Sequence, residues 1–79
     1  MKKWHYFEDE IVYCNGDPNK ELGSLDGDGG VIITWNLKNG KMIFHIDYCR
    51  NCLSCPEYTQ YASSLTQAKK LARDLMSIR

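Results

Sequence analysis

The dipeptide Asn39-Gly40 restricts the fold of this chain more than any other feature, because it lies between two runs rich in β-branched and aromatic residues. A two-residue type I′ turn needs positive φ angles at both central positions, and Asn-Gly adopts them readily. A turn of two residues also fixes the register of the strands that it joins. The sequence therefore predicts an antiparallel hairpin with strands 31–38 and 41–49.

In that register the hairpin has one apolar face and one mostly polar face. The apolar face carries four directly opposed pairs, namely Leu37 with Met42, Trp35 with Phe44, Ile33 with Ile46, and Val31 with Tyr48. The polar face carries Asn36 with Ile43, Thr34 with His45, and Ile32 with Asp47. Because side chains alternate along a strand, a slip of one residue would expose the whole apolar set. We therefore expect all eight residues of the apolar face to belong to the core.

The C-terminal residues have the pattern of an amphipathic helix. Ser64, followed three residues later by Gln67, fits a capping box. Apolar residues then recur at helical spacing, at Leu65, Ala68, Leu71, Ala72, Leu75 and Met76. The opposite side of this helix carries Lys69, Lys70 and Arg73. We predict a helix over about 64–78 that packs its apolar stripe on the Trp35/Phe44 face of the hairpin.

The N-terminal third is less regular. Residues 4–7 and 11–14 favour strands and are separated by Glu8-Asp9-Glu10, so we expect one interrupted strand or two short ones beside the hairpin. The chain has 79 residues, which is the size of one domain. The predicted fold class is α+β, with a single domain (1–79) in which an antiparallel sheet of three or four strands is packed by one C-terminal helix.

Composition argues against several classes of protein. Lys and Arg total 10, as do Asp and Glu, so the chain lacks the basic surplus that general nucleic-acid binding needs. No apolar run approaches the roughly 18 residues of a membrane helix. Charged residues at Lys2, Lys3 and 8–10 leave no room for the apolar segment of a signal peptide. We therefore expect a cytoplasmic protein that binds no membrane and whose principal partner is not nucleic acid.

The balanced total hides a polarised distribution of charge. Between Glu8 and Asp28 there are seven acidic residues and one basic residue, whereas the rest of the chain has nine basic and three acidic residues. Such a separation is ordinary for solvated loops at one end of a chain and a basic helix face at the other. It also suits a protein that orients itself toward a charged partner.

Four cysteines form the clearest chemical motif. Cys49, Cys52 and Cys55 follow the pattern C-x-x-C-x-x-C, and Cys14 would join them if its strand ends near the open end of the hairpin. Four thiolates suit a tetrahedral zinc ion, which would staple a small domain. Part of an iron–sulfur site is an alternative, although the sequence lacks the fourth nearby cysteine of a bacterial ferredoxin run. Reduced thiols, or disulfides in any of three full pairings, remain open as well.

The polar face of the hairpin is a second candidate site. His45, Asp47 and Cys49 alternate along one strand, so all three point away from the core. Such a row could bind a metal or hold a general base, but more often it faces solvent or a partner. Ile32 and Ile43 share this face and would form an apolar patch unless the N-terminal segment covers them. The predicted partner-binding set combines this face with the acidic residues: Glu8, Asp9, Glu10, Asp26, Asp28, Ile32, Ile43, His45 and Asp47.

Motifs typical of enzymes are missing from the sequence. It contains no P-loop, no dinucleotide-binding fingerprint and no nucleophile elbow, and its two histidines are His5 and His45. A chain of this length also has little room for a deep substrate pocket. We expect no enzymatic activity and assign no catalytic residue.

The hairpin, followed by a helix that opens Ser64-Leu65-Thr66-Gln67-Ala68-Lys69-Lys70-Leu71-Ala72, resembles very small phage-borne and prophage-borne proteins. Some of these are inhibitors of host defence, such as anti-CRISPR proteins. The resemblance covers residues 31–79. It implies a stand-alone protein that occupies a surface of another macromolecule, and the acidic stretch from Glu8 to Asp28 would suit a mimic of nucleic-acid phosphate.

One principal hypothesis and two alternatives follow. The principal hypothesis is a small non-enzymatic protein that binds a host or cellular protein, as a phage-type inhibitor would, with the cysteines as a zinc staple. The first alternative is a small metal-binding or redox protein in which the cysteine cluster is the functional site. The second is nucleic-acid binding through Lys69, Lys70 and Arg73. We expect a monomer or a small homo-oligomer.

Overall fold

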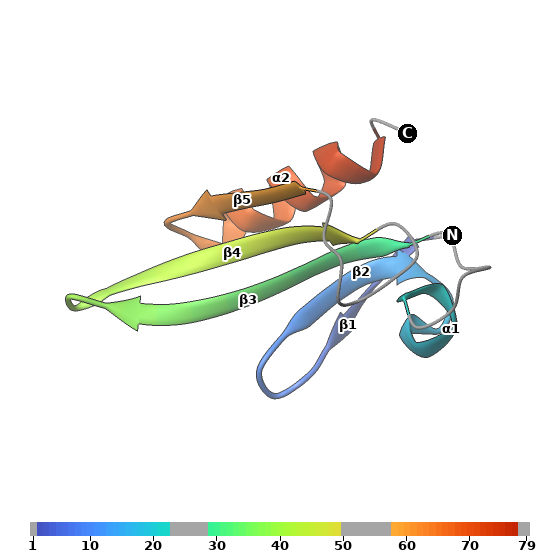
Figure 1. Ribbon diagram of the computed structural model, residues 1–79, viewed down its shortest axis with the longest axis horizontal. Coiled ribbons are helices and arrows are strands. Elements are labelled where there is room, and N and C mark those ends of the chain that lie inside the picture. Colours follow the sequence, from blue (N-terminus) through green and yellow to red (C-terminus); the bar gives the residue numbers. More distant parts are fainter. Residues whose placement is uncertain (1, 23–28, 50–57, 78–79) are drawn as a thin grey trace.

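The structure is a computed structural model that describes residues 2–22, 29–49 and 58–77. These residues form five strands and two helices: β1 (Lys2–Tyr6), β2 (Ile11–Asn15), α1 (Pro18–Leu22), β3 (Gly30–Lys38), β4 (Lys41–Cys49), β5 (Tyr58–Ala62) and α2 (Leu65–Ser77). The strands make one antiparallel sheet whose spatial order follows the chain, β1-β2-β3-β4-β5 (Figure 1). The predicted α+β class, with an antiparallel sheet and a C-terminal helix, is confirmed, and the sheet has five strands where three or four were expected.

The central hairpin forms in the predicted register. Asn39 and Gly40 have φ angles of 54° and 78°, as a type I′ turn requires. Trp35 pairs with Phe44, and the centres of their rings are 6.3 Å apart. The register therefore places the apolar pairs of β3 and β4 on one face of the sheet, as the alternation predicts.

Helix α2 covers this apolar face, which we call the helix face. The Oγ of Ser64 accepts a hydrogen bond from the backbone N–H of Gln67 at 3.2 Å, which is one half of the predicted capping box. The core between helix and sheet contains Ile11, Val31, Ile33, Ile46, Tyr48, Ala62, Ala68, Ala72, Leu75 and Met76. Ala68 and Ala72 have no exposed surface, so α2 lies close against the strands. In the described ranges, neither helix has the length and apolar character that crossing a membrane would require.

The expectation that all eight apolar residues of the hairpin belong to the core is wrong for two of them. Leu37 is 71% exposed and Met42 is 42% exposed. β2 pairs with β3 only at residues 30–33, and β5 pairs with β4 only at residues 44–48, so the end of the hairpin projects beyond its neighbours (Figure 1). We call this projecting part, residues 34–43, the ribbon. Leu37 and Met42 stay exposed because burial needs a facing element, and α2 packs farther back along the sheet.

The N-terminal third forms two short strands, which is one of the two arrangements expected. β1 and β2 are antiparallel, and the N–H of Phe7 closes their turn by donating to the carbonyl of Glu10 at 2.9 Å. Trp4 stacks on Tyr13 with their ring centres 4.3 Å apart. Both rings pack against the core under α2, so these strands extend the core toward the edge of the sheet.

Sequence reasoning did not find β5 or α1. The alternation of Thr59 and Tyr61 is a strand signal, since threonine and tyrosine favour pleated sheets. α1 begins with Pro18 at its first position, where a missing N–H costs nothing. The side chain of Asp17 caps it by accepting the N–H of Asn19 at 3.0 Å.

Candidate functional site

The face of the sheet opposite α2, which we call the open face, carries most of the predicted partner-binding side chains of the hairpin. In Figure 1, α2 lies along one side of the sheet, while α1 lies beside the end of β2. Strand pairing places His45 opposite Thr34 on one side and opposite Tyr61 on the other, so these three side chains share the open face. The open face is therefore assembled from strands β3, β4 and β5.

A hollow of about 490 Å³ lies on the open face between the ribbon and β5. It is lined by Asn36, Lys38, Ile43, His45 and Tyr61. The rings of His45 and Tyr61 meet edge to face, with their centres 5.0 Å apart. Tyr61 is 62% exposed and Ile43 is half-buried, so the hollow has an accessible apolar floor. The amide of Asn36 and the ammonium group of Lys38 lie beside it.

A second hollow, of about 370 Å³, shares two residues with the first. Ile43 and Tyr61 line both, and Ala62, Ser63 and Gln67 complete the second one at the junction of β5 and α2. Ile43 and Tyr61 are thus the apolar residues that line both hollows. Such a pair suits a partner that presents apolar side chains.

The predicted row of His45, Asp47 and Cys49 points to one face, but its members have separate surroundings. Asp47 accepts a hydrogen bond from the hydroxyl of Thr59 at 2.8 Å, which ties β4 to β5. His45 packs on Tyr61, whereas Cys49 is buried. Across the described ranges, no three His, Cys, Asp or Glu side chains converge in the way that a metal ion needs.

Ile32 takes no part in an exposed patch. It is 8% exposed and belongs to a second buried cluster with Val12, Cys14 and Cys49. Burial of Ile32 by the N-terminal segment was the predicted alternative to an apolar patch. Val12 of β2 pairs directly with Ile32 and contributes to this burial from the neighbouring strand.

Cys14 and Cys49 lie on the open face on either side of Gly30, which pairs with both of them. Because β3 lies between their strands, the Cα atoms of Cys14 and Cys49 are separated by two interstrand distances, or about 9.5 Å. A disulfide requires Cα atoms ~4.4–6.8 Å apart. Cys14 therefore ends its strand beside the open end of the hairpin, as the four-cysteine prediction requires. Cys52 and Cys55 lie outside the described residues.

Burial raises the pKa of the Cys14 thiol, and the carboxylates of Glu21 and Asp17 raise it further. The thiol is 0% exposed, so charging it would place an anion in an apolar cluster. In the absence of a metal, Cys14 is a neutral buried thiol rather than a reactive thiolate.

The acidic residues do not form one surface in the described part of the chain. Glu8 and Asp9 are exposed and Glu10 is half-buried in the β1–β2 turn. Asp17 and Glu21 lie beyond the other end of β2, a strand of five residues. That length separates the two groups by about 17 Å. Asp26 and Asp28 lie outside the described residues.

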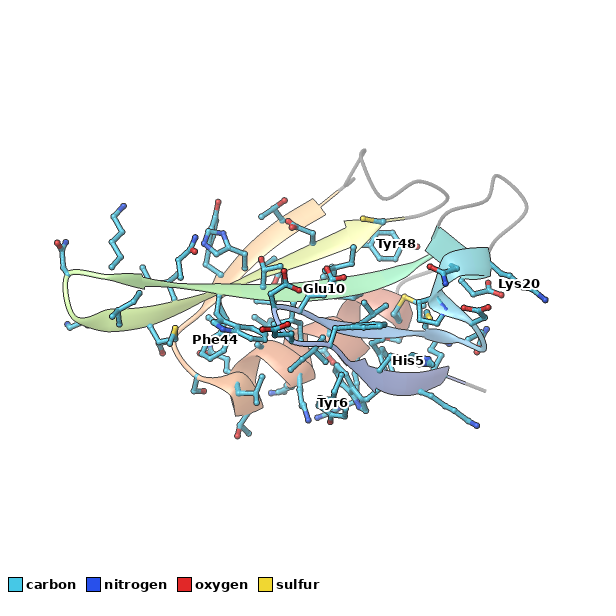
Figure 2. All side chains as sticks on the ribbon, turned by 90° about the horizontal axis from the view of Figure 1, so that it is seen from below. His5, Tyr6, Glu10, Lys20, Phe44 and Tyr48 are labelled. Atoms are coloured by element: carbon cyan, nitrogen blue, oxygen red, sulfur yellow. The ribbon has the colours of Figure 1, made fainter. Side chains whose placement is uncertain are left out.

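The basic face of α2 is partly engaged within the fold. Lys69 donates a hydrogen bond to the hydroxyl of Tyr6 at 2.6 Å and lies over the ring of Trp4. Figure 2 shows Tyr6 on the side of the sheet that α2 occupies. Lys70 and Arg73 are exposed. The surface available for nucleic acid on this helix is therefore smaller than the sequence pattern indicates.

The predicted partner-binding set included Ile43 and His45 but left out Tyr61, Asn36 and Lys38. The signal for Asn36 and Lys38 was present, because period-two alternation puts both on the face of Ile43. Tyr61 required β5, which was not predicted. The pairing of Tyr61 with His45 brings β5 to the hollow as the third strand that lines it, beside β3 and β4.

No protein-family model matches the chain, and comparison with curated proteins and with solved structures finds no match.

Proposed function

We propose that this chain is a small non-enzymatic protein that binds another protein through its open face. The observation that carries the proposal is the hollow of about 490 Å³ between the ribbon and β5. Its floor is aliphatic and aromatic and its rim is polar, which is the composition of a protein-binding surface. Tyr61 is the best anchor, since tyrosines at the centre of interfaces contribute much of the binding energy.

The lining residues define the chemistry of the partner. Ile43, His45 and Tyr61 favour an apolar or aromatic side chain, while Lys38 favours a carboxylate close to it. The partner segment is therefore an apolar anchor flanked by an acidic residue. In its specific form, the proposal is a phage-type inhibitor that acts in the cytoplasm on a host or cellular protein, which rests on the resemblance of residues 31–79.

The test begins with a photo-crosslinking residue at position 61, and at position 7 as the control. Tyr61 and Phe7 are both exposed aromatics, at 62% and 50%, but Phe7 lies in the β1–β2 turn away from the hollow. The partner captured at position 61 is then purified and its affinity measured. Tyr61→Ala should weaken binding at least tenfold, about 1.4 kcal/mol, and Phe7→Ala should leave it unchanged. Equal affinities for Tyr61→Ala and the parent chain would refute the proposal.

A structural zinc ion held by the four cysteines is a second proposal. The observation that favours it is the placement of Cys14 and Cys49 on one face, flanking the glycine between them. Zinc would have to displace the proton of Cys14, so its binding would weaken as pH falls. A metal-binding or redox role for the cysteines would rest on the same pair of residues.

Native mass spectrometry with and without chelator tests the second proposal. One zinc ion, lost on chelation together with the fold, is the expected result. Cys14→Ser should abolish the zinc adduct. A protein of unmodified mass that keeps its fold in chelator would exclude a staple, and a mass excess of iron and sulfide would favour the redox alternative.

A further inference from the structure

The ribbon has an open strand edge on the side of β3. β3 contains nine residues, but β2 pairs only with residues 30–33, so that among the described strands none lies beside residues 34–38 on that side. In a two-residue hairpin the closing pair, Lys38 with Lys41, is hydrogen-bonded, and the bonding direction then alternates. Trp35 and Leu37 therefore direct their backbone N–H and C=O groups toward the open edge.

We propose that two copies of this chain pair along this edge, antiparallel and about a two-fold axis. Trp35 of each copy then lies opposite Leu37 of the other, and Asn36 lies opposite Asn36. In this register the outward-facing backbone N–H and C=O groups of Trp35 and Leu37 in one copy hydrogen-bond to those of Leu37 and Trp35 in the other. The two five-stranded sheets become one continuous sheet.

The exposed side chains of the helix face support this register. Leu37 is 71% exposed beside the half-buried Trp35, and both lie on the helix face. Directly opposed side chains in an antiparallel pair have Cβ atoms about 4.5–5.5 Å apart. Pairing therefore places Leu37 of one copy against the indole of the other, which removes from water the most exposed apolar residue of the ribbon.

Charge complementarity selects a second copy as the occupant. The acidic turn, Glu8-Asp9-Glu10, connects β1 to β2 at the end of this hairpin that diverges from β3 (Figure 1). The tip of the ribbon carries Lys38 and Lys41. The antiparallel register puts Lys38 of one copy opposite Thr34 of the other, level with Glu10. Each basic tip thus meets the acidic turn of the other copy, twice per dimer.

The first test is the mass of the purified chain in solution by sedimentation equilibrium, from micromolar to millimolar concentration. We expect the mass to rise from 9.1 kDa toward twice that value. Leu37→Pro removes an N–H that the pairing uses but that the β3–β4 ladder does not, and it should abolish the dimer. Met42→Pro is the matched control, because its N–H faces the opposite edge of the ribbon. A monomer at all concentrations, or a dimer unaffected by Leu37→Pro, would overturn the proposal.

A charge-swap experiment tests the register without a proline. Lys38→Glu and Glu10→Lys should each weaken dimerisation about tenfold, and the double variant should restore it. Within one chain, Lys38 lies four residues along β3 from the level of Glu10, or about 13 Å, so the rescue requires two copies. A dimer that shows no rescue would contradict the two-fold arrangement. Because no other protein is present, these results do not depend on the proposed function.

Discussion

Lys69 of α2 and Tyr6 of β1, which are 63 positions apart in the chain, are joined by a hydrogen bond of 2.6 Å from the ammonium to the phenol hydroxyl. The same Nζ atom lies 4.8 Å from the centre of the Tyr6 ring and 5.0 Å from that of Trp4. Among the strands that the structure describes, β1 lies at the edge of the sheet and pairs only with β2. The lysine therefore links this edge strand directly to the C-terminal helix.

Replacement of Lys69 should destabilise the fold modestly. Lys69→Met keeps much of the alkyl chain but removes the charge, and it should lower the free energy of unfolding by about 0.5–1 kcal/mol. Lys70→Met, at an exposed position on the same helix, should change it by less than about 0.5 kcal/mol. Urea denaturation of the three proteins gives the comparison, and equal effects of the two substitutions would mean that the contact is not stabilising.

Two residues of β3 on the same face should differ sharply in their contribution to stability. Ile33 is 0% exposed and Leu37 is 71% exposed. Ile33→Ala should cost about 2–5 kcal/mol, because it removes buried methyl groups and leaves a cavity. Leu37→Ala should cost less than about 0.5 kcal/mol in dilute protein. Thermal unfolding at low protein concentration checks this, and similar losses would show that the ribbon is packed.

The close approach of α2 to the sheet predicts sensitivity to larger side chains. Ala72 is fully buried, so Ala72→Leu should destabilise the protein by about 1–3 kcal/mol through overpacking. Arg73→Leu places the same side chain on the exposed side of the helix and should be nearly neutral. Calorimetric melting of both variants distinguishes the two sites. A melting temperature raised by Ala72→Leu would reveal unfilled space beneath the helix.

Alkaline pH should destabilise the metal-free protein through Cys14. Its pKa is raised in the folded state, so the folded protein holds the thiol proton more tightly than the unfolded chain. This contribution is fully present below the unfolded thiol pKa of about 8.5 and is lost as pH rises through the folded pKa. With reductant and chelator, the stability difference between the parent chain and Cys14→Ala should fall steadily above that pH. A difference that stays constant to strongly alkaline pH would mean that the thiol is not desolvated.

Local sequence signals predicted the hairpin and the helix because their physical causes are local. Asn39-Gly40 sets the turn, and the turn sets the register of Trp35 with Phe44. Ser64 and the apolar spacing after it set the start and orientation of α2. The candidate site was predicted less well, because the hollow joins Ile43 to Tyr61 from a strand that was not predicted.

The sequence by itself determined the turn, the alternation of faces and the start of the helix, since each depends on backbone preferences and on neighbours a few residues away. Only the tertiary structure decided which apolar residues are buried. Ile33 and Leu37 lie on the same face of β3. Ile33 is buried because α2 packs over it and β2 lies beside it, whereas Leu37 has neither neighbour. The structure likewise decided that Ile32 is buried beside Val12 of β2, while Tyr61 and Ile43 line an open hollow. Burial depends on which distant segments pack together, and spacing along one strand carries no information about that.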